Sequence, residues 1–289
     1  MPECVGLVAG EGELPAIVAR AMRARGLDVV AIALSEPIYA QLQPLVRQLH
    51  YFGAGQGNKI IEALKREGVR DLVLIGKVSK NVLFHRWRFD SRAWRVLRRA
   101  KSFQDDVLLT EIIREFESEG MRVIEQAHFL PDLCPKRGVM TLRRPTRREW
   151  QDIEYGLNVA RSVGKLGIGQ TIVVKHGTIL AVEGMEGTDE AITRGCRLAY
   201  EGAVVVKVSR PGQDPRIDMP TVGMQTLRVM RDGRATVLAI EAGKTIVVGD
   251  SAFPQAADDA GNHVPDRHPD AAEDEPYHVQ DQTHVIHSA

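Results

Sequence analysis

Short apolar runs alternate with amphipathic stretches through the first half of the chain. The runs contain little polar alternation, which is typical of parallel strands covered on both faces. Each run is followed by a stretch with apolar positions at helical spacing, so the pattern predicts a Rossmann-like, doubly wound α/β domain over residues 1–129. Strands are predicted at residues 5–9, 28–34, 49–52, 71–75 and 121–124, and helices at residues 16–25, 59–67 and 105–119.

A proline-rich, basic segment separates this domain from the rest. Residues 130–148 hold three prolines and six basic residues and are interpreted as an interdomain linker. Thr146 and Glu149 have capping-box spacing, which predicts a helix starting at about residue 147. Residues 149–253 are predicted to form a smaller, catalytic mixed α/β domain. Its helices are predicted at 147–164, 189–200 (capped by Thr188) and 223–231, and its strands at 170–175, 179–182, 203–207, 235–240 and 245–248.

The apolar periodicity stops after Phe253. Residues 250–289 contain nine acidic residues, one arginine and five of the nine histidines. Low hydrophobicity with dense charge is typical of disorder, so residues 254–289 are predicted to be a disordered tail. The irregular histidine spacing argues against a built metal site there.

Composition excludes several classes of protein. The 289 residues are 44% hydrophobic and 26% charged, with a formal net charge of +0. No apolar run approaches the roughly 18 residues that a membrane span needs, and no signal peptide is recognisable. Three widely spaced cysteines fit a reducing compartment. We therefore expect a cytoplasmic protein.

The densest charged segment follows the apolar residues 203–206. Lys207 ends that predicted strand, and a loop rich in proline and glycine then carries Asp214, Arg216 and Asp218. In open α/β sheets, ligands bind beyond the carboxyl ends of strands, so this loop is the predicted active site. Magnesium binds oxygen ligands and keeps several waters, so the two aspartates are candidate ligands. Lys207 and Arg216 would balance phosphate charge, which favours phosphoryl transfer. A rigid loop with purely structural ion pairs is the alternative.

A glycine turn in the first domain is a second candidate. Gly10 and Gly12 separate the first strand from the first helix, and they would let backbone amides approach a phosphate. The third glycine of the dinucleotide fingerprint is absent, so a tight turn without a ligand is an equal alternative. Lys77, after the strand at 71–75, is the candidate cationic partner.

Residues 77–101 are strongly basic, with nine Lys or Arg against one acidic residue and three interleaved aromatic residues among 87–94. Three interpretations stay open. The segment is a solvated helical face, a surface for a phosphorylated ligand or an anionic membrane, or a nucleic-acid surface. No recognised nucleic-acid-binding module accompanies it, so no nucleic-acid partner is expected.

Five motifs resemble one known family, in the same order over about residues 3–262: LVAGEGELP, LIGKVSK, QDDVLL, VVKHGTILAVEGMEGTDE and KVSRPGQDPRIDMPTVGMQT. The chain resembles the LpxI family, magnesium-dependent UDP-2,3-diacylglucosamine pyrophosphatases of lipid A biosynthesis. The resemblance implies a hydrolase that releases UMP and 2,3-diacylglucosamine 1-phosphate. It also implies two domains with the ligand between them, a homodimer, and Mg²⁺ as cofactor with Mn²⁺ as a substitute.

The resemblance also implies a catalytic aspartate in the loop, without separating Asp214 from Asp218. Expected partners are an acylated UDP-sugar and the anionic inner-membrane surface. A nucleotidyl or sugar-phosphate transferase, or a non-catalytic nucleotide- or lipid-binding regulator, are the alternatives. The candidate catalytic residues are Asp214, Asp218, Lys207 and Arg216, and the candidate substrate-binding residues are Gly10, Gly12, Lys77, Lys175, Gln213, Thr188 and Thr221.

Overall fold

The chain forms two compact units, which are described separately. The first contains Met1–Leu130 together with Asp214–Asp218, and the second contains Pro131–Gln213 and Met219–Ala289. Part of the predicted active-site loop therefore belongs to the first unit, which the predicted domain boundaries did not anticipate. The computed structural model describes residues 3–78, 89–100, 105–216, 218–249, 252–261 and 283–287.

The first unit is built on a five-stranded parallel sheet with the order β3-β2-β1-β4-β5. This confirms the predicted parallel-sheet fold. The order reverses between β1 and β4, and a crevice beyond the carboxyl ends of the strands is expected at such a point. The strands are β1 (Cys4–Ala9), β2 (Asp28–Ala33), β3 (Gln48–Tyr51), β4 (Asp71–Ile75) and β5 (Arg122–Val123).

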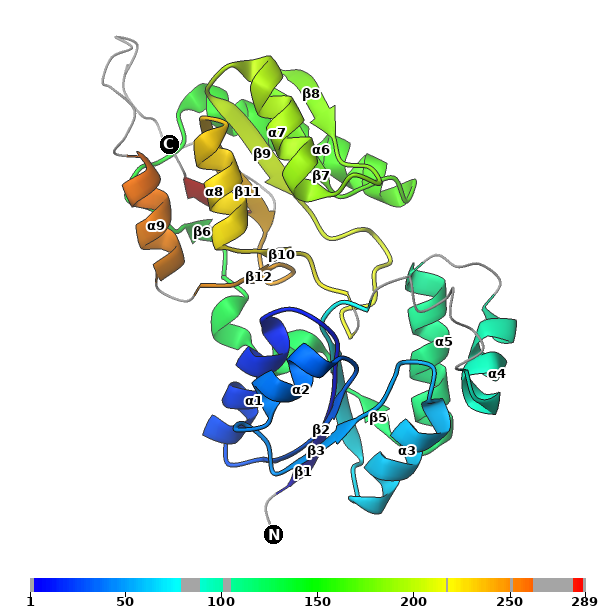
Figure 1. Cartoon of the computed structure of the whole chain (residues 1–289). Helices are drawn as coiled ribbons and strands as arrows, with labels where there is room; N and C mark the ends of the chain where they lie inside the picture. The colour runs from blue at the N-terminus through cyan, green and yellow to red at the C-terminus, as the bar shows by residue number, and fades with distance from the viewer. Residues whose placement is uncertain are drawn as a thin grey trace. The chain divides into compact units, whose positions relative to one another are not determined.

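Helices cover both faces of this sheet (Figure 1). Apolar residues of α3 and α5 form one core with β1, β2, β4 and β5, whereas α1 and α2 contact β2. The helical spacing in the sequence predicts α1, α3 and α5, whereas α2 was not predicted. The helices are α1 (Leu14–Ala24), α2 (Glu36–Leu42), α3 (Gly57–Arg66), α4 (Ser91–Arg99) and α5 (Asp105–Ser118), and the short 3-10 helix η3 (Gln126–Phe129) follows β5.

The second unit has a six-stranded mixed sheet, ordered β6-β13-β11-β9-β7-β8. The predicted hairpin is confirmed, because β7 and β8 pair antiparallel. β9 lies between β7 and β11, and all five of its residues are buried. The strands are β6 (Gly138–Val139), β7 (Thr171–Lys175), β8 (Thr178–Val182), β9 (Ala203–Lys207), β11 (Ala235–Glu241) and β13 (Thr283–His287).

One helix packs on one face of this sheet and three helices pack on the other. α6 (Arg147–Lys165) contributes Ile153, Leu157 and Ala160 to a core with β7, β9 and β11. The capping box predicted for its start is confirmed, since Thr146 and Glu149 bond to each other's backbone amides. The opposite core contains side chains from α7 (Thr188–Ala199), α8 (Met224–Asp232) and α9 (Ala252–Gly261).

The structure differs from the sequence interpretation at the tail and the linker. α9 buries Phe253 and Ala257, and β13 pairs with β11 over residues 237–241, so neither segment is part of a disordered tail. Charge counted over the whole segment hid these short apolar patterns. The predicted linker contains β6, which joins the six-stranded sheet. In the described part of the chain, every helix is too short or too polar to cross a membrane.

Candidate functional site

The predicted active-site loop begins with a firmly held turn in the second unit. The carboxylate of Glu241, at the end of β11, accepts a hydrogen bond from the Ser209 amide at 2.9 Å. Arg161 of α6 donates two bonds to the same carboxylate, which is only 5% exposed. The Gln213 side chain then accepts from the Arg210 amide at 2.9 Å and closes the turn. Sequence reasoning missed Glu241, since nothing local links it to the loop.

Asp214 and Arg216 form an ion pair within the same loop. Asp214 Oδ1 accepts from the amide and the Nε of Arg216 at 3.0 and 2.9 Å, and Oδ2 accepts from a terminal guanidinium nitrogen at 2.6 Å. These bonds hold the pKa of the Asp214 carboxyl below its ordinary value. Arg216 also donates to Glu117 of α5 at 2.8 Å. The Asp218 amide donates to the Asp214 carbonyl at 3.2 Å, which places the two aspartates one turn apart.

The segment Asp214–Asp218 is fixed to the first unit through Gln126 of η3. The Gln126 amide donates to the Pro215 carbonyl at 3.3 Å, and its side chain donates to the Leu74 carbonyl in β4 at 2.8 Å. Gln126 is buried. The segment thus lies at the carboxyl ends of β4 and β5, where α/β sheets bind ligands. In the sequence this loop follows β9 of the second unit. Nothing in the sequence indicates that it also contacts the sheet of the first unit.

At Gly10 the structure agrees with the tight-turn alternative. The Gly10 amide donates to the Ile75 carbonyl at 2.8 Å, and Glu11 and Lys77 exchange backbone bonds of 2.7 and 2.9 Å. A Cβ atom on Gly10 would lie 2.5 Å from the Lys77 carbonyl oxygen. Gly10 therefore allows two backbones to meet, and its amide is not available to a phosphate. Gly12 and Lys77 are exposed nearby, at the carboxyl ends of β1 and β4.

Lys207 ends β9 and is 6% exposed in the second unit. Its ammonium donates to the Thr188 hydroxyl at 3.2 Å and to the Thr221 carbonyl at 3.0 Å. Thr188 in turn donates to Glu183 at 2.8 Å. Gly187, not Thr188, is the N-cap of α7, and Thr221 lies in the short strand β10 (Thr221–Val222), which pairs with β12 (Ile246–Val247). The structure thus brings together three of the predicted residues in roles the pattern did not foresee.

Lys175 lies at the other end of the same sheet. β7 runs antiparallel to β9, with Thr171 opposite Lys207, so the carboxyl end of β7 points away from the Lys207 cluster. Four residues of strand correspond to roughly 13 Å. The Lys175 ammonium donates to the carbonyls of Ala199 and Glu201 at 3.1 and 2.7 Å, at the end of α7. The structure does not place Lys175 with the other candidates.

Asp214 and Asp218 are the two aspartates predicted to bind magnesium. Among the described residues, no three His, Cys, Asp or Glu side chains form a metal-binding group. Magnesium needs only one or two protein carboxylates when waters and phosphates complete its shell. Both oxygens of Asp214 accept bonds from Arg216, and Asp218 is half-buried on the next turn of the loop. Two carboxylates one turn apart are oxygen donors of the kind that magnesium takes when waters and phosphates complete its shell.

The surroundings of Cys134 and Cys196 do not favour a nucleophilic role for either thiol. Burial raises the pKa of Cys134 and of Cys196 to about 11. At neutral pH both groups are protonated and poorly nucleophilic.

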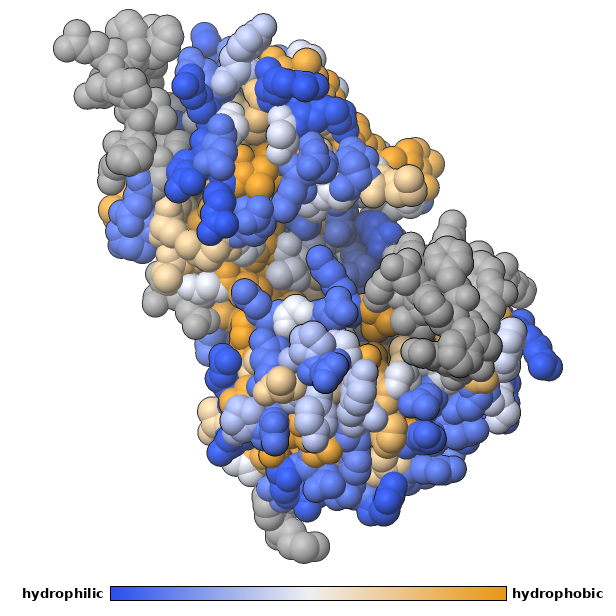
Figure 2. Space-filling model, in the orientation of Figure 1, coloured by the Kyte–Doolittle hydropathy of each residue, from blue (hydrophilic) through white to orange (hydrophobic). Residues whose placement is uncertain are grey.

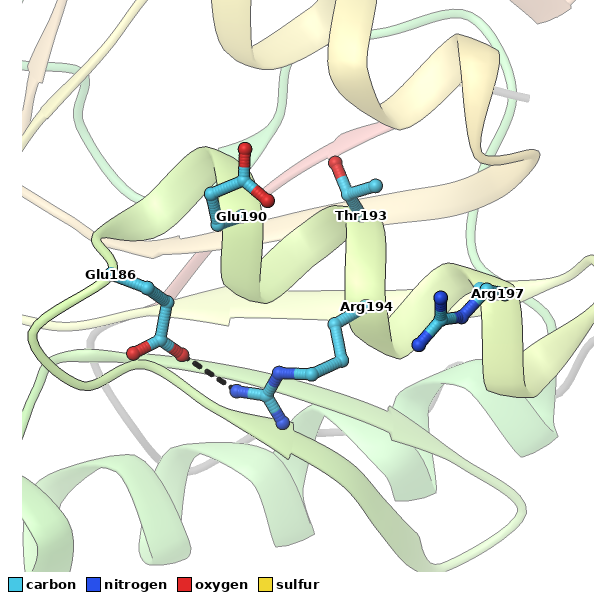
Figure 3. A pocket seen from close by; sticks show the side chains of 5 residues that line it. All are labelled: Glu186, Glu190, Thr193, Arg194 and Arg197. Carbon is cyan, nitrogen blue, oxygen red and sulfur yellow. Dashed lines mark hydrogen bonds and ion pairs between the residues drawn. The ribbon is translucent and has the colours of Figure 1, made fainter.

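A hollow of about 550 Å³ lies along the outer face of α7 (Figure 3). It is lined by Glu186 and by four α7 residues, and Arg194 pairs with Glu186 at 2.6 Å. None of the candidate catalytic or substrate-binding residues lines it. The hollow is therefore separate from the Lys207 cluster.

Comparison with known proteins identifies both halves of the chain. The model of the LpxI N-terminal domain matches residues 4–133, and the model of the LpxI C-terminal domain matches residues 136–264. The UDP-2,3-diacylglucosamine pyrophosphatase LpxI of Caulobacter vibrioides is 36% identical over 277 residues, covering 90% of this chain and 96% of that protein.

Solved structures match far more weakly. AnUbiX in complex with FMN and dimethylallyl pyrophosphate is 12% identical, with a TM-score of 0.19 over 42% of this chain and 94% of its own. The biotin carboxylase subunit of pyruvate carboxylase is 16% identical, with a TM-score of 0.23 over 64% of this chain and 36% of its own. At such scores the likeness carries no argument.

Proposed function

The chain belongs to the LpxI family, and from this premise we propose that it hydrolyses the pyrophosphate bond of UDP-2,3-diacylglucosamine to UMP and 2,3-diacylglucosamine 1-phosphate. The observation that carries the proposal is the extent of the family match, which includes both domains and 36% identity to a relative bearing that name. The proposed activity agrees with the charged groups of the loop, which suit a phosphate substrate.

We assign different roles to the two aspartates. Asp214 is held by the Arg216 guanidinium on both oxygens, so it orients that cation and fixes the turn. Asp218 follows one turn later and is the proposed magnesium ligand. When bound, magnesium supplies positive charge to the phosphate oxygens and favours a deprotonated water. Arg216 adds positive charge beside the phosphate, although its Nε and one terminal nitrogen donate to Asp214 and its other terminal nitrogen donates to Glu117.

Lys207 is the proposed phosphate-binding cation of the second unit. Burying an ammonium carries a large desolvation cost, so a lysine that is 6% exposed at the end of a central strand points to a use beyond stability. Its ammonium donates to the Thr188 hydroxyl and to the Thr221 carbonyl, and Thr188 is itself held by its bond to Glu183. Gln213 shapes the turn that leads to Asp214.

The direct test incubates the purified full chain with UDP-2,3-diacylglucosamine and measures UMP, with Mg²⁺, with Mn²⁺ and with a chelator. We expect UMP release from water alone as acceptor, and we expect the chelator to abolish it. An Asp218→Asn variant should bind the nucleotide yet release UMP at a rate lower by about 100-fold or more. A wild-type protein that binds the substrate without releasing UMP would instead be a binding protein. Formation of a sugar-phosphate conjugate with an added acceptor would indicate a transferase.

A further inference from the structure

Two short loops of the second unit expose large apolar side chains. Leu166 and Ile168 follow α6 and are 74% and 53% exposed, and Met185, between β8 and α7, is 105% exposed. Glycines flank them, at Gly167 between the first two and Gly184 before the third. Side chains this exposed add little to a core, and several of them together form a candidate binding surface. We name these three side chains the apolar edge.

The two loops lie side by side. A Cβ atom on Gly169 would be 2.0 Å from the carbonyl oxygen of Glu183, so the backbones are in direct contact. The Gln170 amide also donates to the Glu183 carboxylate at 3.3 Å. Figure 1 shows the loop after α6 and the loop before α7 at the same end of the unit, and Figure 2 shows apolar side chains at that end. The three side chains therefore form one surface rather than scattered exposed residues.

The apolar edge borders the beginning of the active-site loop. The Val208 amide donates to the Gln170 carbonyl at 3.0 Å. The Pro211 ring would lie 3.2 Å from a Cβ atom on Gly164, at the end of α6. Glu183, which contacts the edge through Gly169, also accepts the bond from Thr188 in the Lys207 cluster. The edge and the proposed phosphate-binding lysine thus share one end of one sheet.

We propose that the apolar edge docks this protein on the surface of an anionic lipid bilayer. Exposed apolar side chains enter the boundary between headgroups and acyl chains, and neighbouring cations strengthen such binding. Lys165 is exposed directly before Leu166. The acidic residue after Met185, Glu186, is paired with Arg194, which reduces its repulsion of anionic headgroups. This proposal rests on the proposed function, because docking on a membrane brings the enzyme to a diacylated substrate that resides there.

A second copy of the chain fits this surface less well. Three side chains expose at most a few hundred Å², whereas a stable dimer buries roughly 800 Å² on each partner. Small glycine-flanked tips can instead insert into a lipid interface one side chain at a time. The bilayer is therefore the partner that the size and chemistry of the edge favour.

Co-sedimentation of the full chain with vesicles of phosphatidylglycerol and phosphatidylethanolamine tests the proposal. The triple variant Leu166→Ser, Ile168→Ser, Met185→Ser should lower the partition coefficient by at least about tenfold, as expected for losing even one buried apolar side chain. Tyr200→Ser is the matched control, because Tyr200 is 85% exposed and follows the carboxyl end of α7, whereas Met185 precedes the amino end of that helix. It should bind vesicles like the wild type. Unfolding midpoints should be unchanged in both variants, since the replaced side chains are exposed.

Measurements of UMP release distinguish a failure of the docking proposal from a failure of the proposed function. With substrate in vesicles the triple variant should show a raised KM, and with a water-soluble short-acyl substrate it should match the wild type. Vesicle binding by the wild type without any UMP release would support docking and refute the proposed function. Equal vesicle binding by wild type and triple variant would overturn the proposal. A loss of turnover by the triple variant that is confined to the soluble substrate would also overturn the docking proposal, because it would assign the apolar edge to acyl-chain binding.

Discussion

Replacing Lys207 by methionine tests whether the ammonium group of Lys207 serves activity or stability. The substitution keeps the approximate length and apolar stem of the side chain and removes the ammonium. The hydrogen bonds that are lost include one to the Thr188 hydroxyl at 3.2 Å and one to the Thr221 carbonyl at 3.0 Å. Because the site is 6% exposed, the desolvation cost of the charge disappears as well.

The two effects on stability oppose each other. Hydrogen bonds to a charged group contribute about 1.5–3 kcal/mol each, so the lost bonds cost about 3–6 kcal/mol. Removing a buried ammonium recovers several kcal/mol of desolvation. We expect the free energy of unfolding to change by no more than about 2 kcal/mol. Loss of a cation that stabilises phosphate charge in the transition state should lower kcat/KM by about 100- to 1,000-fold.

The assay pairs urea unfolding with kcat/KM for UMP release. Lys175→Met is the matched control, because Lys175 also belongs to this sheet and donates to two carbonyls, at the opposite end. It should lose about 1–3 kcal/mol of stability and keep its kcat/KM within about twofold. A Lys207→Met enzyme with wild-type kcat/KM would refute the phosphate role. Equal losses of kcat/KM in both variants would refute the distinction between the two lysines.

Three further predictions concern the first unit. Asp214→Asn should lower kcat less than Asp218→Asn does, and only the Asp218 variant should raise the magnesium concentration needed for half-maximal UMP release. Because Arg216 lowers the pKa of Asp214 below its ordinary value, their pair stabilises the fold fully at pH above that ordinary value and progressively less as pH falls through the lowered pKa. Urea midpoints measured down this pH range should fall more in the wild type than in Asp214→Asn. Gly10→Ala should cost about 1–3 kcal/mol of stability, since its Cβ meets backbone at 2.5 Å, whereas Gly53→Ala, with its nearest atom at 4.0 Å, should be nearly neutral.

Local patterns were sufficient to predict most elements. The apolar run in β4 and the capping box at Thr146 each depend on residues close together in the chain, and both were predicted correctly. The Thr188 cap was wrong because a helix start depends on backbone conformation, and Gly187, at φ 87°, takes the N-cap position. β13 was missed because its pairing with β11 joins residues more than 40 positions apart.

The candidate site likewise has features that follow from the sequence and features that depend on tertiary contacts. The sequence by itself determined which chemical groups are available, because Asp214, Arg216, Asp218 and Lys207 stand in one recognisable motif. The tertiary structure alone decided what each group does in the folded chain. Asp214 is committed to Arg216, and the segment that contains them joins the sheet of the first unit through Gln126. The Asp214–Arg216 pair joins residues two positions apart, but the bonds that hold this segment on the first unit join Gln126 to Pro215 and Glu117 to Arg216, which are 89 and 99 positions apart. No local pattern encodes such distant contacts.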